Sequence, residues 1–354
     1  MTRHFAAILI LLVVLPATVS AQVRPFVFGL DERVSFKPDG SYFFNHTDPD
    51  LVFEAQVAPD LQIVGNVAQQ LTKVLSPTSA PTVRAYAVFA TPMFRIRMFD
   101  EDSNPVRTPS YMPKVSAQVA WFKSLARDDQ KGPERYEQPV RMLLLHFVPF
   151  GHHSNGQNGC LFEGQERPDC EPKQTSVPYT AALNTQDGSF STNYLRAGVG
   201  YRRMYPTGKN DEIEDPASVT KREWGVGATV EFNPKGYVGG ALSDELRLTY
   251  GATRFEIDAD YAKRDLAVWK LTCGRAQVSA TFRYIHGAAF DLKYGGAAEV
   301  FCLPKRWGGS GLFLRYVNGQ DYYNVNFFQR IQRLQFGVTF DQMKFLMFAL
   351  PSTG

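Results

Sequence analysis

The sequence predicts an all-β protein, a transmembrane antiparallel up-and-down β-barrel of about 12 strands. Apolar and polar residues alternate with a period of two along many segments, as expected for strands with two different faces. The chain carries 27 Phe, 16 Tyr and 4 Trp in 354 residues, and aromatic residues gather at the ends of barrel strands. The mean hydropathy of −0.24 fits a barrel too, because a polar lumen offsets the apolar outer face.

Residues 1–21 are expected to form a secretory signal peptide that directs the chain to a bacterial-type outer membrane. Arg3 and His4 come before an apolar stretch that ends at Leu15, and small residues up to Ala21 precede Gln22. The stretch is too short for a spanning helix, and no later window is apolar enough for one. An N-terminal membrane anchor is the alternative interpretation.

The expected domains follow from where the alternation begins and ends. Residues 22–50 show no clear strand and are expected to be a periplasmic tail or plug, residues 51–348 the barrel, and residues 349–354 a C-terminal tail. Residues 155–188 are expected to form an extended loop between two strands. Strands are expected near residues 51–58, 83–98, 114–122, 141–154, 193–204, 223–232, 245–253, 254–262, 276–285, 296–302, 311–317 and 324–340.

The segment EWGVGATVEF, residues 223–232, has the clearest alternation. Val226 and Val230 share one face, and Glu223 and Glu231 share the other. A soluble β-sandwich also alternates, but charged residues or glycine on one face of strand after strand favour a polar lumen and a lipid-facing wall. In lipid such strands must close, because an open edge leaves backbone groups unpaired.

The charge and the cysteines limit the other classes. A net charge of +3 is too small to argue for a nucleic-acid partner. The four cysteines are an even number, which favours disulfides in an oxidising compartment. Cys160 and Cys170 close a short loop and are expected to pair, which leaves Cys273 for Cys302. No CxxC spacing indicates a metal site.

The stretch GHHSNGQNG, residues 151–159, ends one of the expected strands. The even-numbered positions of that expected strand, residues 141–154, are Met142, Leu144, His146, Val148, Phe150, His152 and Ser154. Alternate residues share a face of a strand, so His152 and Ser154 are expected on a largely apolar, lipid-facing wall. On the next expected strand, Asn193 shares a face with apolar residues. If the two strands are antiparallel neighbours, these three polar side chains meet outside the barrel.

Such a set can perform nucleophilic catalysis. A serine hydroxyl becomes a nucleophile when a histidine takes its proton, and a third group holds the tautomer of that histidine. Ser154, His152 and Asn193 fit these three roles. Polar groups near hydrocarbon lose water, which makes sense if the substrate is a membrane lipid. The alternative is a polar hairpin loop with Asn-Gly turn chemistry.

Two motifs resemble the outer-membrane phospholipase A family, whose members are esterases built on a β-barrel. HHSNGQ matches its His-x-Ser-Asn-Gly from His152 to Gly156, and SFSTN matches its Ser-x-Ser-x-Asn at Ser189, Ser191 and Asn193. Looser similarities are PSYMPK around Tyr111 and RYVNGQDYYNVNF from Arg315 to Phe327. The resemblance implies that Ser154 is the nucleophile, His152 the general base and Asn193 the orienting group. It implies that Gly156 offers its backbone N–H to the oxyanion.

The resemblance also implies a calcium ion at the interface of a homodimer. Its ligands would include the Ser189 hydroxyl and the Gln157 backbone carbonyl, since calcium prefers oxygen. This chain departs from the family by a long insertion between Ser154 and Asn193, in place of a short turn that carries an acidic ligand. Asp187 is the candidate substitute.

The leading hypothesis is therefore an outer-membrane phospholipase that hydrolyses acyl esters of glycerophospholipids through a serine acyl-enzyme. A1 activity is expected, with A2 and lysophospholipase activity as extensions. One alternative is a non-enzymatic outer-membrane barrel, either a small pore or a surface-loop protein. Another is an esterase that acts on a different lipid-linked ester, such as an acyl chain of lipid A.

Overall fold

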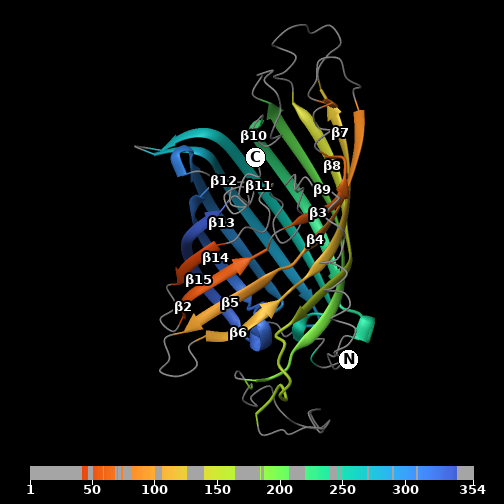
Figure 1. The fold of residues 1–354 in the computed structure, drawn as a ribbon, viewed down its shortest axis with the longest axis vertical. Coiled ribbons are helices and arrows are strands. Elements are labelled where there is room, and N and C mark those ends of the chain that lie inside the picture. The colour runs from red at the N-terminus through yellow and green to blue at the C-terminus, as the bar shows by residue number, and fades with distance from the viewer. Residues whose placement is uncertain are drawn as a thin grey trace, which may run out of the picture.

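The structure is a computed structural model, and its fold is all-β (Figure 1). It describes residues 42–46, 51–58, 60–67, 70, 73–74, 82–99, 106–125, 139–163, 184, 187–206, 220–239, 246, 249–268, 271–288, 291–307 and 310–340. The signal peptide, the C-terminal tail and Cys170 fall outside these residues. None of the described helices is both long and apolar enough to cross a membrane.

The described strands form one antiparallel sheet. They are β1 (Tyr42–His46), β2 (Leu51–Val57), β3 (Leu61–Gly65), β4 (Thr82–Thr91), β5 (Phe94–Phe99), β6 (Val106–Tyr111), β7 (Lys114–Ser124), β8 (Val140–Ser154), β9 (Ser191–Pro206), β10 (Thr220–Phe232), β11 (Thr253–Val268), β12 (Leu271–His286), β13 (Tyr294–Pro304), β14 (Ser310–Gln320) and β15 (Arg330–Phe340). Short 3-10 turns are η2 (Tyr237–Gly239), η3 (Lys305–Trp307) and η4 (Asn324–Phe328).

Neighbouring strands in the sheet are mostly neighbours in the sequence. From β9 to β15 each strand pairs with the next one. Strand β1 pairs with β2 on one side and with β15 on the other. Strand β8 pairs with β7, with the end of β6 and with β9. Figure 1 shows the strands inclined to the long axis of the molecule.

Short breaks divide three stretches of the sheet into two strands each. The breaks lie between β2 and β3, between β4 and β5, and between β6 and β7. The sequence has a proline in each break, at Pro59, Pro92 and Pro113, and proline has no N–H to donate to a ladder. One residue from each break, Ala58, Met93 and Met112, joins a single buried cluster. We call this set of breaks the break line, and it runs across the sheet towards β8.

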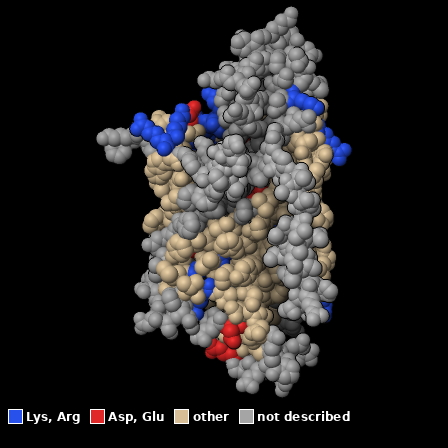
Figure 2. Space-filling model, viewed as in Figure 1, with Lys and Arg blue, Asp and Glu red and all other residues tan. Residues whose placement is uncertain are grey.

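Over the strands that follow β9 the burial pattern is inverted relative to a water-soluble protein, whereas β4, β7 and β8 bury an apolar cluster. On β10 and β11 the apolar side chains are exposed, for example Val230 and Ile257, whereas Glu231 and Asp258 are buried. The same reversal holds on other strands, because the buried polar residues include arginines paired with carboxylates, such as Arg202 with Asp260. Figure 2 shows a largely uncharged band across the middle of one face, with Lys, Arg, Asp and Glu mostly towards its ends.

Several expected strands needed correction. Tyr42–His46 forms β1 within the span assigned to a tail or plug, and β3 and β6 were not expected. The expected strand 245–253 is wrong, because Leu246, Thr249 and Tyr250 are helical and Tyr250 is buried. The sequence LRLTYGA alternates, but it also suits a helix, because Leu246 and Tyr250 are four residues apart and so share one face of a helix.

The structure contains the disulfide that was expected from elimination. Cys273 on β12 is bonded to Cys302 on β13, with Cα atoms 5.4 Å apart. Cys160 is also disulfide-bonded, while Cys170, its expected partner, lies outside the described residues.

Candidate active site

A one-residue bulge on β8 decides which way its last residues point. The pairing of β8 with β9 shifts by one residue between Val148 and Gly151, and the pairing with β7 shifts in the same region. Before the bulge the even-numbered side chains of β8 are buried, and after it the odd-numbered ones are. A shift of one residue exchanges the two faces of a strand.

The bulge corrects the face predicted for the first half of β8. Met142, Leu144, His146 and Val148 are buried, so they do not belong to the outer wall. His146 therefore offers no exposed polar group to a dimer interface. His152 and Ser154 nevertheless lie on the outer face, because the bulge at Pro149 and Phe150 reverses the alternation.

Gly151 leaves room for the ring of Tyr194 just after the bulge. It pairs with Tyr194 across the two strands. A Cβ atom at Gly151 would lie 2.2 Å from the Tyr194 ring, so no other residue fits without a rearrangement. The glycine that opens GHHSNG is thus a packing requirement.

His152 and Asn193 are direct partners across β8 and β9. The Nδ1 atom of His152 lies 2.6 Å from the Oδ1 atom of Asn193, within hydrogen-bond distance. The Asn193 amide nitrogen donates to the backbone carbonyls of Tyr237 and Val238 at 2.9 and 3.1 Å. Because both N–H groups of the amide are used in this way, its oxygen must accept from His152. Nδ1 then carries the proton, and Nε2 is left as the basic atom.

Ser154 lies two residues beyond His152 on the same face of β8 and pairs with Ser191 of β9. Both His152 and Ser154 are partly exposed. Within the described residues no hydrogen bond joins the Ser154 hydroxyl to the His152 imidazole. Such bonds are often long without substrate and shorten when it binds.

Asn155 holds the loop that follows Ser154. Its buried side chain donates to the carbonyl of Gly188 at 2.6 Å and accepts from the N–H of Phe190 at 3.0 Å and of Gln157 at 3.3 Å. Gly156 has a φ of 68°, in the left-handed region that glycine tolerates. The Asn-Gly pair therefore shapes the chain directly after Ser154.

His153 points the opposite way, into the interior, and is 0% exposed. Its Nε2 atom lies 3.0 Å from the Ser110 hydroxyl, and its Nδ1 atom lies 2.9 Å from the Tyr250 hydroxyl. The ring also packs against Phe190 and Tyr322. The central residue of HHS is thus an anchor on the buried side of the strand.

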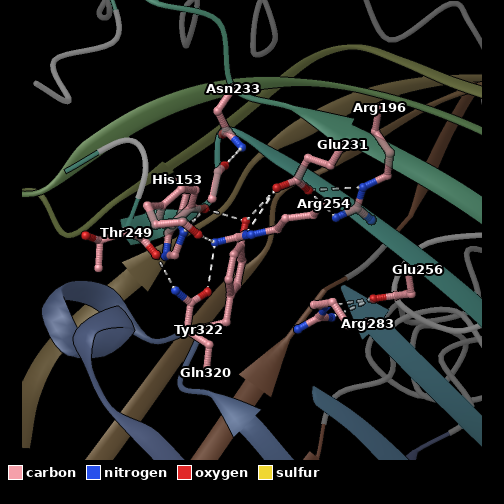
Figure 3. Close-up of polar contacts among 12 residues, drawn as sticks. His153, Arg196, Glu231, Asn233, Thr249, Arg254, Glu256, Arg283, Gln320 and Tyr322 are labelled. Carbon is pink, nitrogen blue, oxygen red and sulfur yellow. Dashed lines mark hydrogen bonds and ion pairs between the residues drawn. The ribbon is translucent and has the colours of Figure 1, made fainter. Parts of the chain in front are cut away.

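A connected polar network lies behind His153 (Figure 3). The Tyr250 hydroxyl is hydrogen-bonded to that of Tyr322, which lies 3.3 Å from a carboxylate oxygen of Glu231. Arg196 and Arg254 pair with the two oxygens of Glu231 at 2.6 and 3.1 Å. Burial raises the pKa of Tyr322 to about 12 and raises that of Tyr250 well above its usual value, so both phenols stay neutral.

Part of the looser similarity near the C-terminus is also buried. Asp321 and Tyr323 are buried, and Asp321 pairs with Arg97 of β5 at 2.5 Å. The Tyr323 hydroxyl donates to the carbonyl of Thr108 at 2.9 Å. Sequence reasoning gave these residues no role, because contacts between positions so far apart leave no local pattern.

The residues expected to bind calcium offer little charge. The Asp187 carboxylate accepts from the Asn184 amide at 2.5 Å, and the Gln157 side chain donates to the Thr108 hydroxyl at 3.0 Å. Ser189 is partly exposed. Within the described ranges no group of three or more His, Cys, Asp or Glu could hold a metal ion. Calcium takes six to eight oxygens, and this set with its one carboxylate does not fit it.

The chain is similar to several solved structures at low sequence identity. No family model matches the chain, and no curated protein matches it. Outer membrane phospholipase A from Escherichia coli is a similar solved structure, with 12% identity, a TM-score of 0.47 and coverage of 90% of this chain and 98% of that one. That is the family which the motifs resemble.

Two other solved structures are also similar. The Salmonella typhi outer membrane phospholipase, described as a dimer with bound calcium, shares 14% identity at a TM-score of 0.43, covering 91% of this chain and 98% of that one. The beta domain of a Bordetella autotransporter shares 9% identity at a TM-score of 0.33, covering 85% of this chain and 96% of that one.

Proposed function

We propose that this protein is an outer-membrane esterase that hydrolyses acyl esters of glycerophospholipids. The observation that carries the proposal is the 2.6 Å contact between Nδ1 of His152 and Oδ1 of Asn193, on the same wall as Ser154. This contact leaves Nε2 free to accept a proton. The motif resemblance adds the reaction class, because the same residue types in the same order occur in outer-membrane phospholipase A.

The proposal includes a membrane barrel of about 12 strands. The strand pairings support closure, since they lead from β1 through β2, β5 and β6 to β8, then through β9 to β15 and back to β1. If the two strands on either side of each break of the break line are counted as one, the strands β1 to β15 reduce to 12. The apolar outer wall with charged residues inside is the arrangement that lipid requires.

In the proposed mechanism Ser154 attacks the ester carbonyl carbon while Nε2 of His152 takes the hydroxyl proton. The backbone N–H of Gly156 is the candidate donor to the oxyanion. Collapse breaks the bond to the glycerol oxygen, which takes the proton from His152 and leaves as lysophospholipid. Water then attacks the acyl-serine as His152 takes one of its protons, and the fatty acid departs with the hydroxyl of Ser154 restored. Asn193 stabilises the imidazolium at each stage.

A calcium requirement and a homodimer enter from the resemblance alone. No step above passes through a metal, because the described residues do not fit one. We expect a chelator to distinguish the cases: retention of full activity in EDTA would show that this chain has lost the requirement. Crosslinking in detergent, with and without calcium, measures dimer formation.

The proposed function is tested by hydrolysis of a phospholipid in mixed micelles. Wild type is expected to release fatty acid and lysophospholipid, and Ser154→Ala to lose at least about 1000-fold in kcat, since it lacks the nucleophile. Ser310→Ala on β14 is the matched control. A sulfonyl fluoride should label Ser154 and should not label the variant. Full activity in Ser154→Ala would exclude the mechanism.

The same preparation separates the alternatives. Single-channel conductance without ester hydrolysis would favour a pore. Release of acyl chains from lipid A, with none from glycerophospholipid, would retain the mechanism and change the substrate class.

A further inference from the structure

We propose that the turn of residues 234–239 between β10 and β11, here called the clamp turn, is a positioning element for the site. Tyr237 and Val238 would fix the Asn193 amide so that its oxygen faces His152. The catalytic part of this inference rests on the proposed function, whereas the tautomer part does not.

The first support is the double contact with Asn193. Its amide nitrogen donates to two successive carbonyls, those of Tyr237 and Val238. An amide that rotated by 180° would set its oxygen against these carbonyls and its nitrogen against His152. The clamp turn therefore selects one orientation of Asn193. It also covers Asn193, which is 5% exposed although its side of β9 is the outer wall.

The second support is an anchor from the clamp turn to β8. The Tyr237 hydroxyl donates to the backbone carbonyl of Pro149 at 2.6 Å. Pro149 belongs to the bulge that turns His152 outward. One residue thus contacts both halves of the site, Asn193 through its carbonyl and the bulge through its hydroxyl.

The third support is the backbone of Val238. Its φ of 50° and ψ of 33° lie in the left-handed region, which β-branched residues avoid. The side chain is 64% exposed, so burial does not compensate for this conformation. The left-handed conformation of Val238 brings its carbonyl to the Asn193 amide. Strain of this kind is kept where the surrounding contacts need it.

The clamp turn also explains why an amide, and not a carboxylate, holds His152. A carboxylate at this position would accept from His152 equally well, but it has no N–H for the two carbonyls. Its second oxygen would face them directly, which is repulsive. Asn193→Asp is therefore expected to be no more active than Asn193→Ala. If only the acceptor mattered, the aspartate would be clearly better than alanine.

The experiment uses the full-length protein in detergent micelles, with five variants: Asn193→Asp, Asn193→Ala, Tyr237→Phe, Tyr261→Phe and His152→Gln. Tyr261 is the matched control, because it is an exposed tyrosine on the outer wall. Steady-state hydrolysis gives kcat and KM for each protein. ¹⁵N spectra of histidine-labelled protein give the tautomer of His152 and the exchange rate of its ring proton, and His152→Gln assigns the signal.

We expect Tyr237→Phe to lower kcat about 5-fold with KM unchanged, because the imidazole is held less well. The exchange of the Nδ1 proton should be about 10-fold faster than in Tyr261→Phe, since the loosened clamp turn exposes it more often. Tyr237→Phe matching Tyr261→Phe in both measurements would overturn the proposal. So would Asn193→Asp exceeding Asn193→Ala in kcat.

The two proposals can fail separately. If wild type hydrolyses no lipid, the proposed function fails, while an Nδ1-protonated His152 that exchanges faster in Tyr237→Phe still supports the clamp turn. If wild type is active and Ser154→Ala is not, but the Nδ1 proton of His152 exchanges equally fast in Tyr237→Phe and Tyr261→Phe, the esterase stands and the clamp turn does not.

Discussion

His153 separates the two candidate catalytic side chains in the sequence and faces the other way. Both of its ring nitrogens are within hydrogen-bond distance of buried hydroxyls, those of Ser110 and Tyr250. Because His153 is held on the inner face, β8 cannot rotate about its own axis at this point. His152 and Ser154 are therefore held facing outward. His153 therefore contributes to the stability of the site, while His152 and Ser154 are the residues of the proposed chemistry.

We predict that His153→Phe destabilises the fold by about 2–4 kcal/mol, because the buried hydroxyls of Ser110 and Tyr250 each lose one hydrogen-bond partner. His153→Gln should recover part of the loss, since its amide can donate and accept. Urea unfolding in micelles measures both, and exposed His286 provides the control His286→Phe. Equal midpoints for His153→Phe and His286→Phe would show that the anchor is dispensable.

The sequence was sufficient to select His152, Ser154 and Asn193 as one set, because the two motifs that carry them are local. It could not select Tyr237 or Val238. Their contacts to Asn193 use backbone carbonyls, which every residue has, and the clamp turn is 44 and 45 positions away from Asn193 along the chain.

At the scale of elements, β8 contains two parts with opposite faces. The expected outward face of Met142 and Leu144 followed from unbroken alternation and was wrong. Pro149 was the available signal, since proline in a strand often marks a bulge. Strands β10 and β11 were predicted with the correct faces because their alternation has no interruption.

We predict that inserting one alanine between Phe150 and Gly151 turns His152 and Ser154 into the interior, because one added residue exchanges the two faces of the strand that follows. Hydrolysis should fall to the level of Ser154→Ala, and the sulfonyl fluoride should no longer label Ser154. Inserting one alanine after Gly287 instead, in the turn that follows β12, is the comparison, since it leaves β8 intact and Ser154 accessible. Persistent labelling of Ser154 in the first variant would show that the strand restores its register in another way.

At the scale of the whole molecule, the inverted burial pattern decides the surroundings in which the fold is stable. Exposed side chains such as Val230, Phe255 and Ile257 need lipid or detergent, whereas the interior carries its own charge compensation through pairs such as Arg202 with Asp260. The general class was predictable, since composition and period report it directly. The breaks of the break line could not be predicted, because the alternation of apolar and polar residues gives no sign of them.

We predict that Ile257→Arg, which places a charge at a position 59% exposed on the outer wall, costs about 2–4 kcal/mol near the middle of a bilayer. Thr220→Arg, at the first residue of β10, should cost less than about 1 kcal/mol, since the penalty fades towards the interface. Folding into lipid vesicles at graded urea concentrations gives both values. Equal costs would contradict a lipid-facing position for Ile257.

The break line has a consequence for how the wall would open. Pro92 and Pro113 supply no amide hydrogen where neighbouring strands divide, and β8 bulges beside them. Deuterium uptake should therefore begin in a belt along this line and spread outward, instead of starting at the rims. The proposed nucleophile Ser154 would then lie beside the part of the sheet that exchanges first.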